Sequence, residues 1–273
     1  MEWHKAKNVL ILLFLSVNIF LLCVLADSNN KDNFDKTKLS EVFLKNNINI
    51  DMEILPKPKN RLFVSEFYGV NDEVIHFFVP KILKVDGTTY SNETRTLMVE
   101  GNKISFTDSA PSDQSFKNVT TENVESKLKP ILKELGIFSS VVMENISESS
   151  GMYMVEYEYI PAKYKIFYNK LIFLISNRGI LKCEGEIYLP DKKNGYSYEI
   201  NTAETILVQF DKKINVPLNV KSIKLGLYIL DYESALTTQA IPAYEIVTDK
   251  KTYIYDARIG VDRQNRELGG FDK

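Results

Sequence analysis

The pattern of apolar and polar positions changes several times along the chain, and each change marks a different kind of element. Residues 9–26 form an apolar run of eighteen residues without a charge. At about 1.5 Å of rise per residue, such a run spans roughly 27 Å as a helix, close to the ~30 Å hydrocarbon core of a bilayer. The run therefore predicts a transmembrane helix, preceded by a short N-terminal segment, residues 1–8.

The charges beside the apolar run predict its orientation. Lys5 and Lys7 precede it, whereas acidic residues dominate after it. Because basic residues are retained on the cytoplasmic side, residues 1–8 are expected in the cytoplasm and the remainder outside the cell membrane. Two alternatives stay open: a signal peptide cleaved after Ala26, and a lipid anchor carried by Cys23.

After the run, polar residues 27–36 predict a short stem, and the chain then reads as a first α+β domain over residues 37–115. A weak amphipathic helix is expected near residues 35–46. From residue 48 onward apolar and polar positions alternate with a period of two, which is typical of strands. Strands are expected at 48–54, 62–68, 74–79, 82–85, 96–99 and 104–106. Hairpin turns are expected at Asp86-Gly87 and at Gly101-Asn102.

A Pro-, Ser- and Asp-rich segment at 109–117 predicts the boundary to a second α+β domain, residues 116–260. A helix is expected at 121–135, because five apolar residues fall on one stripe, with Gly136 as its C-cap and Pro130 as a kink. A short helix is expected at 202–210, and the polar tail, residues 261–273, is expected to be loose. Further strands are expected at 151–160, 171–175, 180–189, 223–232, 241–247 and 252–257.

Composition narrows the class of protein. The 273 residues carry a formal net charge of −2, which does not favour a nucleic-acid partner. Of the two cysteines, Cys23 lies in the apolar run and Cys183 lies beyond it, so no disulfide is expected to join residues outside the membrane. A large exported domain without disulfides fits a bacterial surface.

Residues with catalytic potential are few. The two histidines are His4 and His76, the second within a predicted strand, and no metalloprotease, hydrolase, phosphate-loop or Cys-X-X-Cys motif occurs. Cys183 is expected on the apolar face of its strand as a buried structural thiol. Glu184 and Glu186 are expected on a solvated face. The sequence thus predicts no enzyme, no metal, no cofactor and no small-molecule substrate.

Two groups of residues are candidates for contact with a partner. Ser16 and Asn18 lie inside the apolar run, where an unpaired amide is costly and a hydrogen bond to another transmembrane helix would relieve that cost. Ser16 can instead bond back to its own helix. Tyr153, Tyr157 and Tyr159 share one face of the predicted strand at 151–160, either as an ectodomain contact face or as core packing.

Three stretches resemble the YycI (WalI) family of membrane-anchored regulators. They are residues 1–8 together with 16–22, residues 98–106, and residues 223–228 together with 241–246 and 253–260. The last pattern is also similar to YycH and to PepSY-like domains. Tyr244 stands where these patterns usually have tryptophan, so both a YycI-like and a YycH-like assignment stay open.

The resemblance implies a two-domain α+β ectodomain of the YycH/YycI or PepSY-like kind and no catalysis. It implies control of the sensor histidine kinase WalK (YycG) of the WalK/WalR two-component system, which governs cell-wall homeostasis in low-GC Gram-positive bacteria. The control would pass through transmembrane-helix contacts, together with a YycH-like partner. The alternative is a secreted or anchored PepSY-like module that binds and inhibits an extracytoplasmic enzyme.

Overall fold

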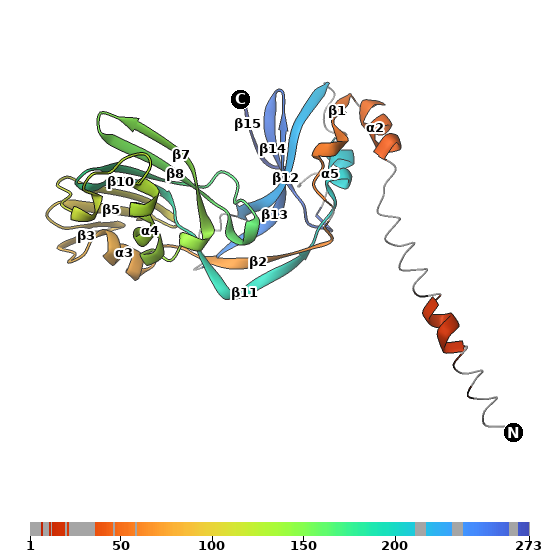
Figure 1. Ribbon diagram of the computed structural model, residues 1–273, viewed down its shortest axis with the longest axis horizontal. Helices are drawn as coiled ribbons and strands as arrows, with labels where there is room; N and C mark the ends of the chain where they lie inside the picture. The colour runs from red at the N-terminus through yellow and green to blue at the C-terminus, as the bar shows by residue number, and fades with distance from the viewer. Residues whose placement is uncertain are drawn as a thin grey trace.

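The computed structural model describes residues 7, 11, 13–19, 21, 36–45, 47–57, 59–210, 217–230, 237–261 and 267–272. Over these residues the protein is a mixed α+β structure with two large sheets, and Figure 1 shows them next to each other, with β2 and β11 between them. All but one of the described strand pairs are antiparallel; β1 and β12 are parallel. The α+β class expected from the sequence is confirmed.

The first sheet has eight strands among the described residues, in the order β3-β4-β5-β6-β10-β9-β8-β7. The predicted central position of residues 171–175 is confirmed, because β9 lies between β8 and β10. The hairpin at Gly101 is also confirmed, and Gly101 has the positive φ (61°) that the turn requires. The strands are β3 (Lys84–Asp86), β4 (Thr89–Ser91), β5 (Arg95–Glu100), β6 (Lys103–Asp108), β7 (Val141–Ser149), β8 (Met152–Tyr159), β9 (Lys170–Ser176) and β10 (Gly179–Glu186).

Two helices, α3 (Asp72–Phe78) and α4 (Val124–Glu134), pack against this sheet. Helix α4 confirms the predicted apolar stripe: Val124, Leu128 and Leu132 are buried, and Gly136 has a φ of 74° beyond its end. Helix α3 replaces a predicted strand. That prediction was wrong because Asn71 caps a helix, its side-chain oxygen accepting a hydrogen bond from the Val74 N–H at 3.0 Å.

The second sheet follows β1-β12-β13-β14-β15 in the described part of the chain, with β2 pairing both β11 and β13. Helix α2 (Lys36–Lys45) confirms the predicted N-terminal helix, with Leu39 and Phe43 buried, and α5 (Ala203–Phe210) confirms the short one. The strands are β1 (Ile48–Ile50), β2 (Arg61–Tyr68), β11 (Leu189–Glu199), β12 (Leu218–Leu230), β13 (Thr237–Thr248), β14 (Lys251–Asp256) and β15 (Glu267–Asp272), and the 3-10 turns are η1 (Met52–Ile54), η2 (Gln114–Phe116), η3 (Phe138–Ser140) and η4 (Pro161–Lys163).

The division of the chain differs from the one expected at residues 109–117. Strand β6 precedes that segment and pairs with β10, which follows it, so both belong to one sheet. Strand β2, placed by its sequence in the first domain, pairs with β11 and β13 of the second sheet. Strands β3 to β10, which lie within residues 84–186, therefore form one sheet that is inserted in the chain between β2 and β11. The polar composition of residues 109–117 marks an exposed connection, and composition carries no information about which strands pair.

The loop between η4 and β9, residues 164–169, connects the two sheets beside β12. The Phe167 N–H donates to the Leu227 carbonyl, and the Leu227 N–H donates to the Lys165 carbonyl, both at 2.8 Å. Gly226 allows this approach, because a Cβ there would lie 2.4 Å from Cζ of Phe167. The loop thus ties the eight-stranded sheet to the second sheet by backbone hydrogen bonds.

The two ends of the chain also depart from expectation. The tail is not loose throughout, because β15 pairs with β14 over residues 267–272. That prediction was wrong because the edge of β14 offers unpaired backbone groups that even a polar strand can use. Half of the residues of the expected transmembrane helix, residues 9–26, lie outside the described residues, and residues 11, 13–19 and 21 are helical. The expected stem, residues 27–36, also lies outside them except for Lys36, which begins α2. Within the described part of the chain, none of the helices has both the length and the apolar character needed to cross a membrane.

Candidate functional site

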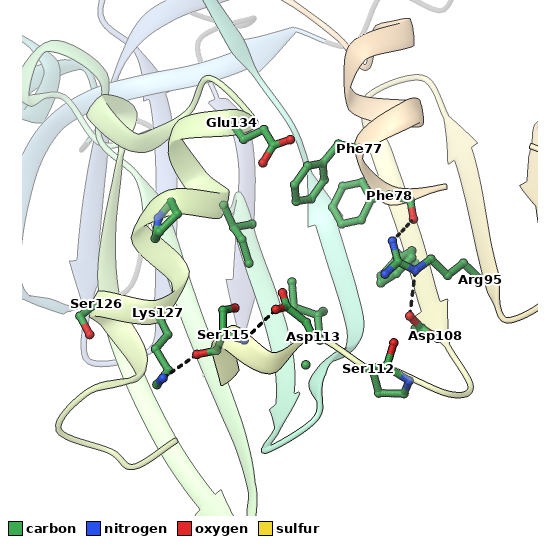
Figure 2. A pocket seen from close by; sticks show the side chains of 16 residues that line it. Phe77, Phe78, Arg95, Asp108, Ser112, Asp113, Ser115, Ser126, Lys127 and Glu134 are labelled. Atoms are coloured by element: carbon green, nitrogen blue, oxygen red, sulfur yellow. Dashed lines mark hydrogen bonds and ion pairs between the residues drawn. The ribbon is translucent and has the colours of Figure 1, made fainter. Parts of the chain in front are cut away.

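A groove of about 550 Å³ that combines apolar and charged side chains lies between α3 and α4. Its base is formed by β6 and β10, and the connection at residues 111–115 closes one end. Figure 2 shows that side chains from both helices and from the sheet point into it. Both the volume and the mixed lining are typical of ligand-binding clefts.

Aromatic rings form the apolar part of the groove. The rings of Phe77 and Phe78 meet edge to face, with centroids 5.1 Å apart, and Phe78 also packs on Phe106 of β6 at 4.8 Å. Ile131 of α4 and Ile180 of β10 complete this surface. Such a surface favours an apolar or aromatic group of a binding partner.

One wall of the groove is built by an ion pair. Arg95 of β5 donates from Nε to Oδ2 of Asp108 at 2.9 Å and from Nη1 to the Phe78 carbonyl at 3.4 Å. The other carboxylate oxygen of Asp108 accepts from the Ala110 N–H at 3.0 Å. The two bonds of Arg95, visible in Figure 2, hold the guanidinium at the groove wall and fix the orientation of its remaining donors.

The opposite wall carries a second cation. Lys127 of α4 donates from Nζ to the Ser115 carbonyl at 2.5 Å, and the Asp113 side chain accepts from the Ser115 N–H at 2.8 Å. Gly179 lies at the base with a φ of 131°, and a Cβ there would come within 3.3 Å of Cβ of Asp113. A side chain at position 179 would therefore strain the backbone and press against the connection that closes the groove.

The groove has the chemistry of a binding site. No histidine or cysteine is among its lining residues. The Ser126 hydroxyl donates to the Asn123 carbonyl at 2.7 Å, and Arg95 and Lys127 are held by the contacts above. The arrangement supplies an apolar base, one cation on each side and carboxylates at the rim.

The structure places the predicted helix-contact residues in the described part of the apolar run. Ser16 Oγ donates to the Leu13 carbonyl at 2.8 Å, and Asn18 Nδ2 donates to the Phe14 carbonyl at 2.9 Å. Both side chains are exposed. An asparagine amide has two N–H donors and an acceptor oxygen, so this bond uses one donor of Asn18.

The three tyrosines proposed as a contact face are in the core. Tyr153, Tyr157 and Tyr159 are 6%, 2% and 0% exposed. Tyr157 meets Phe173 edge to face at 6.0 Å, and Tyr159 meets Tyr188 at 5.7 Å. The shared face was predicted correctly, but it points toward the helices, so packing and not an exposed contact surface accounts for it.

The structure also places the cysteine, the histidine and the two glutamates considered in the sequence analysis. Cys183 is fully buried on β10, as expected, and burial raises the pKa of its thiol. His76 is exposed on α3 and not in a strand. Glu184 forms an ion pair with Lys182, and Glu186 accepts a hydrogen bond from the Tyr188 hydroxyl, both at 2.5 Å. None of these residues lines the α3–α4 groove. The sequence did not reveal this groove, because its walls come from segments that are far apart along the chain.

Comparison with known proteins gives no family assignment: no protein-family model matches the chain, and no curated protein does. The likeness to YycI therefore stays a resemblance of the three stretches.

Several solved structures are similar in outline. The C-terminal domain of YpeB from Bacillus megaterium is 12% identical, with a TM-score of 0.36, over 75% of this chain and 98% of that domain. An uncharacterized protein from Eubacterium rectale is 11% identical, with a TM-score of 0.41, over 81% of this chain and 84% of its own. YycH from Bacillus subtilis is 12% identical, with a TM-score of 0.40, over 70% of this chain but only 51% of YycH.

Proposed function

We propose that this protein is a membrane-anchored, non-catalytic regulator of a WalK-like sensor histidine kinase. It acts together with a YycH-like partner in the control of cell-wall homeostasis, with its C-terminal part outside the cell membrane. The proposal is supported by the three stretches that resemble the YycI family and by the uncharged apolar run at residues 9–26.

A binding role is supported by one observation: the charged groups of the α3–α4 groove are held in place by contacts within the protein. Arg95 is held by Asp108, and Lys127 is held by the Ser115 carbonyl. Groups fixed in this way shape and polarise a surface, whereas catalysis by a nucleophile would require an adjacent base that activates it. The groove therefore supports recognition of a partner in preference to a reaction.

The proposed route of regulation is contact between membrane helices. Lipid tails are as apolar as leucine, so specific association of helices depends on close packing and on polar groups such as Asn18. A hydrogen bond between helices contributes roughly 0.6–2 kcal/mol, which corresponds to a factor of about three to thirty in association. Asn18 is the residue from which such a bond is expected.

The test is to replace residues 9–26 by an unrelated apolar span of equal length and to follow a reporter of the response regulator's target genes. Regulation should be lost although the protein reaches the membrane at its normal level. Asn18→Leu should weaken co-purification with the kinase by about threefold to thirtyfold. Val17→Leu, one residue away, is the matched control and should behave as wild type.

Wild-type output from the exchanged span would contradict regulation through helix contacts. In that case the α3–α4 groove becomes the first surface to mutate, because the face of Tyr153, Tyr157 and Tyr159 is buried. The alternative, a secreted inhibitor, would not depend on the apolar run at all, because it would act after cleavage behind Ala26.

A further inference from the structure

Two adjoining hollows lie where the loop at residues 164–169 meets both sheets. The larger, of about 340 Å³, is lined from β6, β9 and β10, and the smaller, of about 130 Å³, is lined from β10, β12 and β15. Tyr168, Asn169 and Glu186 line both, so the two hollows meet at these residues and together form the junction site. Boundaries between structural units are a common place for ligand sites.

Asn169 is the central polar residue of the junction site and is only 9% exposed. Among the described residues, none donates a hydrogen bond to its side-chain amide or accepts one from it. The amide is nevertheless not sealed off, because the unpaired side-chain atoms that are fully enclosed in the described part of the chain belong to Tyr157, Tyr159, Glu204, Gln209 and Tyr255. A ligand in the junction site can therefore reach this amide, which offers two N–H donors and one acceptor oxygen.

Two opposite charges stand beside the amide. Glu186 accepts a hydrogen bond from the Tyr188 hydroxyl at Oε2, and its Oε1 lies 4.0 Å from Nζ of Lys103. That distance is longer than a hydrogen bond, so the carboxylate can still accept from a ligand and the ammonium can still donate to one. An anionic ligand would meet Glu186 and a cationic ligand would meet Lys103, so the pair favours an uncharged ligand.

Aromatic side chains supply the apolar part of the junction site. Tyr168 is 42% exposed and has a φ of 67°, which is uncommon for a residue other than glycine. Tyr228 of β12 is half-buried in the smaller hollow, and its hydroxyl donates to the Leu268 carbonyl at 3.4 Å. The face of an aromatic ring is negative and attracts the slightly positive hydrogens of C–H groups.

We propose that the junction site binds an uncharged sugar in the pyranose form. Each sugar hydroxyl both donates and accepts, so neighbouring hydroxyls can accept from Asn169 and Lys103 and donate to Glu186. When all hydroxyls are equatorial, the ring presents C–H groups on both faces, and one face packs on Tyr168. This site goes beyond the proposed regulation through membrane helices, and it stands or falls independently of the kinase.

The test uses three probes with one ring and different charges: the methyl β-glycosides of glucose, of glucuronate and of protonated glucosamine. Binding to the full chain in lipid nanodiscs is measured by saturation-transfer NMR of the probe, with empty nanodiscs subtracted. The methyl glucoside should bind several-fold more tightly than the two charged probes. Equal binding of all three, tighter binding of a charged probe, or no binding of the methyl glucoside would overturn the proposal.

Variants then locate the site. Asn169→Leu keeps the size of the side chain and should weaken binding of the methyl glucoside by about threefold to tenfold, the range expected for one hydrogen bond. It should not lower the thermal midpoint, because the amide makes no hydrogen bond within the described part of the chain. Asn145→Leu is the matched control, since Asn145 is exposed on β7 and lines neither hollow. Unchanged binding to Asn169→Leu would refute the role of the amide.

A second variant does not depend on the amide. Tyr168→Gly should fold, because glycine adopts a φ of 67° without strain. Loss of the ring should weaken binding by about threefold to tenfold. Tyr196→Ala is the control, because it removes a ring that is 46% exposed on β11 and lines neither hollow. A methyl glucoside that binds equally to wild type, Asn169→Leu and Tyr168→Gly would have its site elsewhere, which would refute the proposal.

Discussion

Arg95 and Asp108 lie directly opposite each other on β5 and β6, and their side chains form an ion pair of 2.9 Å between Nε and Oδ2. The Asp108 side chain is 3% exposed and that of Arg95 is 32% exposed. The ion pair therefore links β5 to β6 and forms part of one wall of the α3–α4 groove. Its carboxylate is almost completely shielded from water.

The first prediction concerns this ion pair. Arg95→Ala should lower the free energy of unfolding by about 3–5 kcal/mol, because it leaves the buried Asp108 carboxylate without its partner. The control is Arg61→Ala, which removes a cross-strand pair with Glu199 of 2.7 Å between side chains that are 72% and 59% exposed. That change should cost under about 1 kcal/mol. Urea denaturation of the segment from residue 36 onward measures both, and similar losses would contradict the distinction.

The second prediction concerns the loop that joins the two sheets. Gly226→Ala should lower the free energy of unfolding by about 1–3 kcal/mol, the usual cost of overpacking. The new Cβ would lie 2.6 Å from the Lys165 carbonyl oxygen, so the loop must move away from β12. Gly269→Ala is the control, because nothing lies within 4 Å of its Cβ position. Thermal unfolding followed by circular dichroism compares the two, and equal midpoints would exclude a tight loop contact.

The third prediction concerns Cys183. In a Cys23→Ser background, Cys183 should react with a maleimide only as fast as the protein opens, because the thiol is fully buried and burial raises its pKa. Urea should accelerate the reaction in parallel with unfolding. Cys183→Ser should cost about 1–3 kcal/mol of stability by placing a hydroxyl on an apolar face, while regulation is retained. Rapid labelling of the native protein would show that the site is open.

The fourth prediction is a loss of stability at alkaline pH. Burial raises the pKa of Tyr157 to about 12 from the ordinary value of 10.0. Because the folded pKa is the higher one, the stabilisation is fully present below pH 10 and is lost as the pH rises through 12. Tyrosinate absorbance and circular dichroism should therefore change over this window, and Tyr157→Phe should reduce the loss. An unfolding free energy that is constant across it would contradict this account.

The fifth prediction concerns the N-terminus. Mass spectrometry of the protein extracted from membranes should find the peptide that begins at Met1, because regulation through helix contacts requires an uncleaved apolar run. A mature protein that begins at Asp27 would instead support the secreted binding module. Washing the membranes with alkaline carbonate is the control, since it removes proteins that are only peripherally bound.

Periodicity determined much of the local structure. The alternation in residues 151–160 placed Tyr153, Tyr157 and Tyr159 on one face of β8, and the stripe in residues 121–135 predicted α4 and its buried side. The glycine at position 101 predicted the turn between β5 and β6. These features could be read directly because each depends on residues that are close along the chain.

Short or polar segments required the folded context. Residues 74–79 are a short apolar run that is compatible with a strand or with a buried helix. The Asn71 cap favours the helix, α3, because its side-chain oxygen accepts from the Val74 N–H. Strand β11 has a polar sequence and was missed, because it forms through its pairing with β2, and Tyr196 on it stays 46% exposed. Strand β15 was missed for the same reason, since the edge of β14 provides its partner.

The sequence by itself thus determined the α+β class, most of the helices and strands, and which side chains share a face of each. Only the tertiary structure decided that β6 pairs with β10 across the expected boundary, that the three tyrosines point inward, and that α3, α4 and the connection at 111–115 enclose a groove. The physical reason is that periodicity records which side chains lie on the same face of an element, whereas the burial of that face, strand pairing and cavities depend on contacts between residues far apart in the chain.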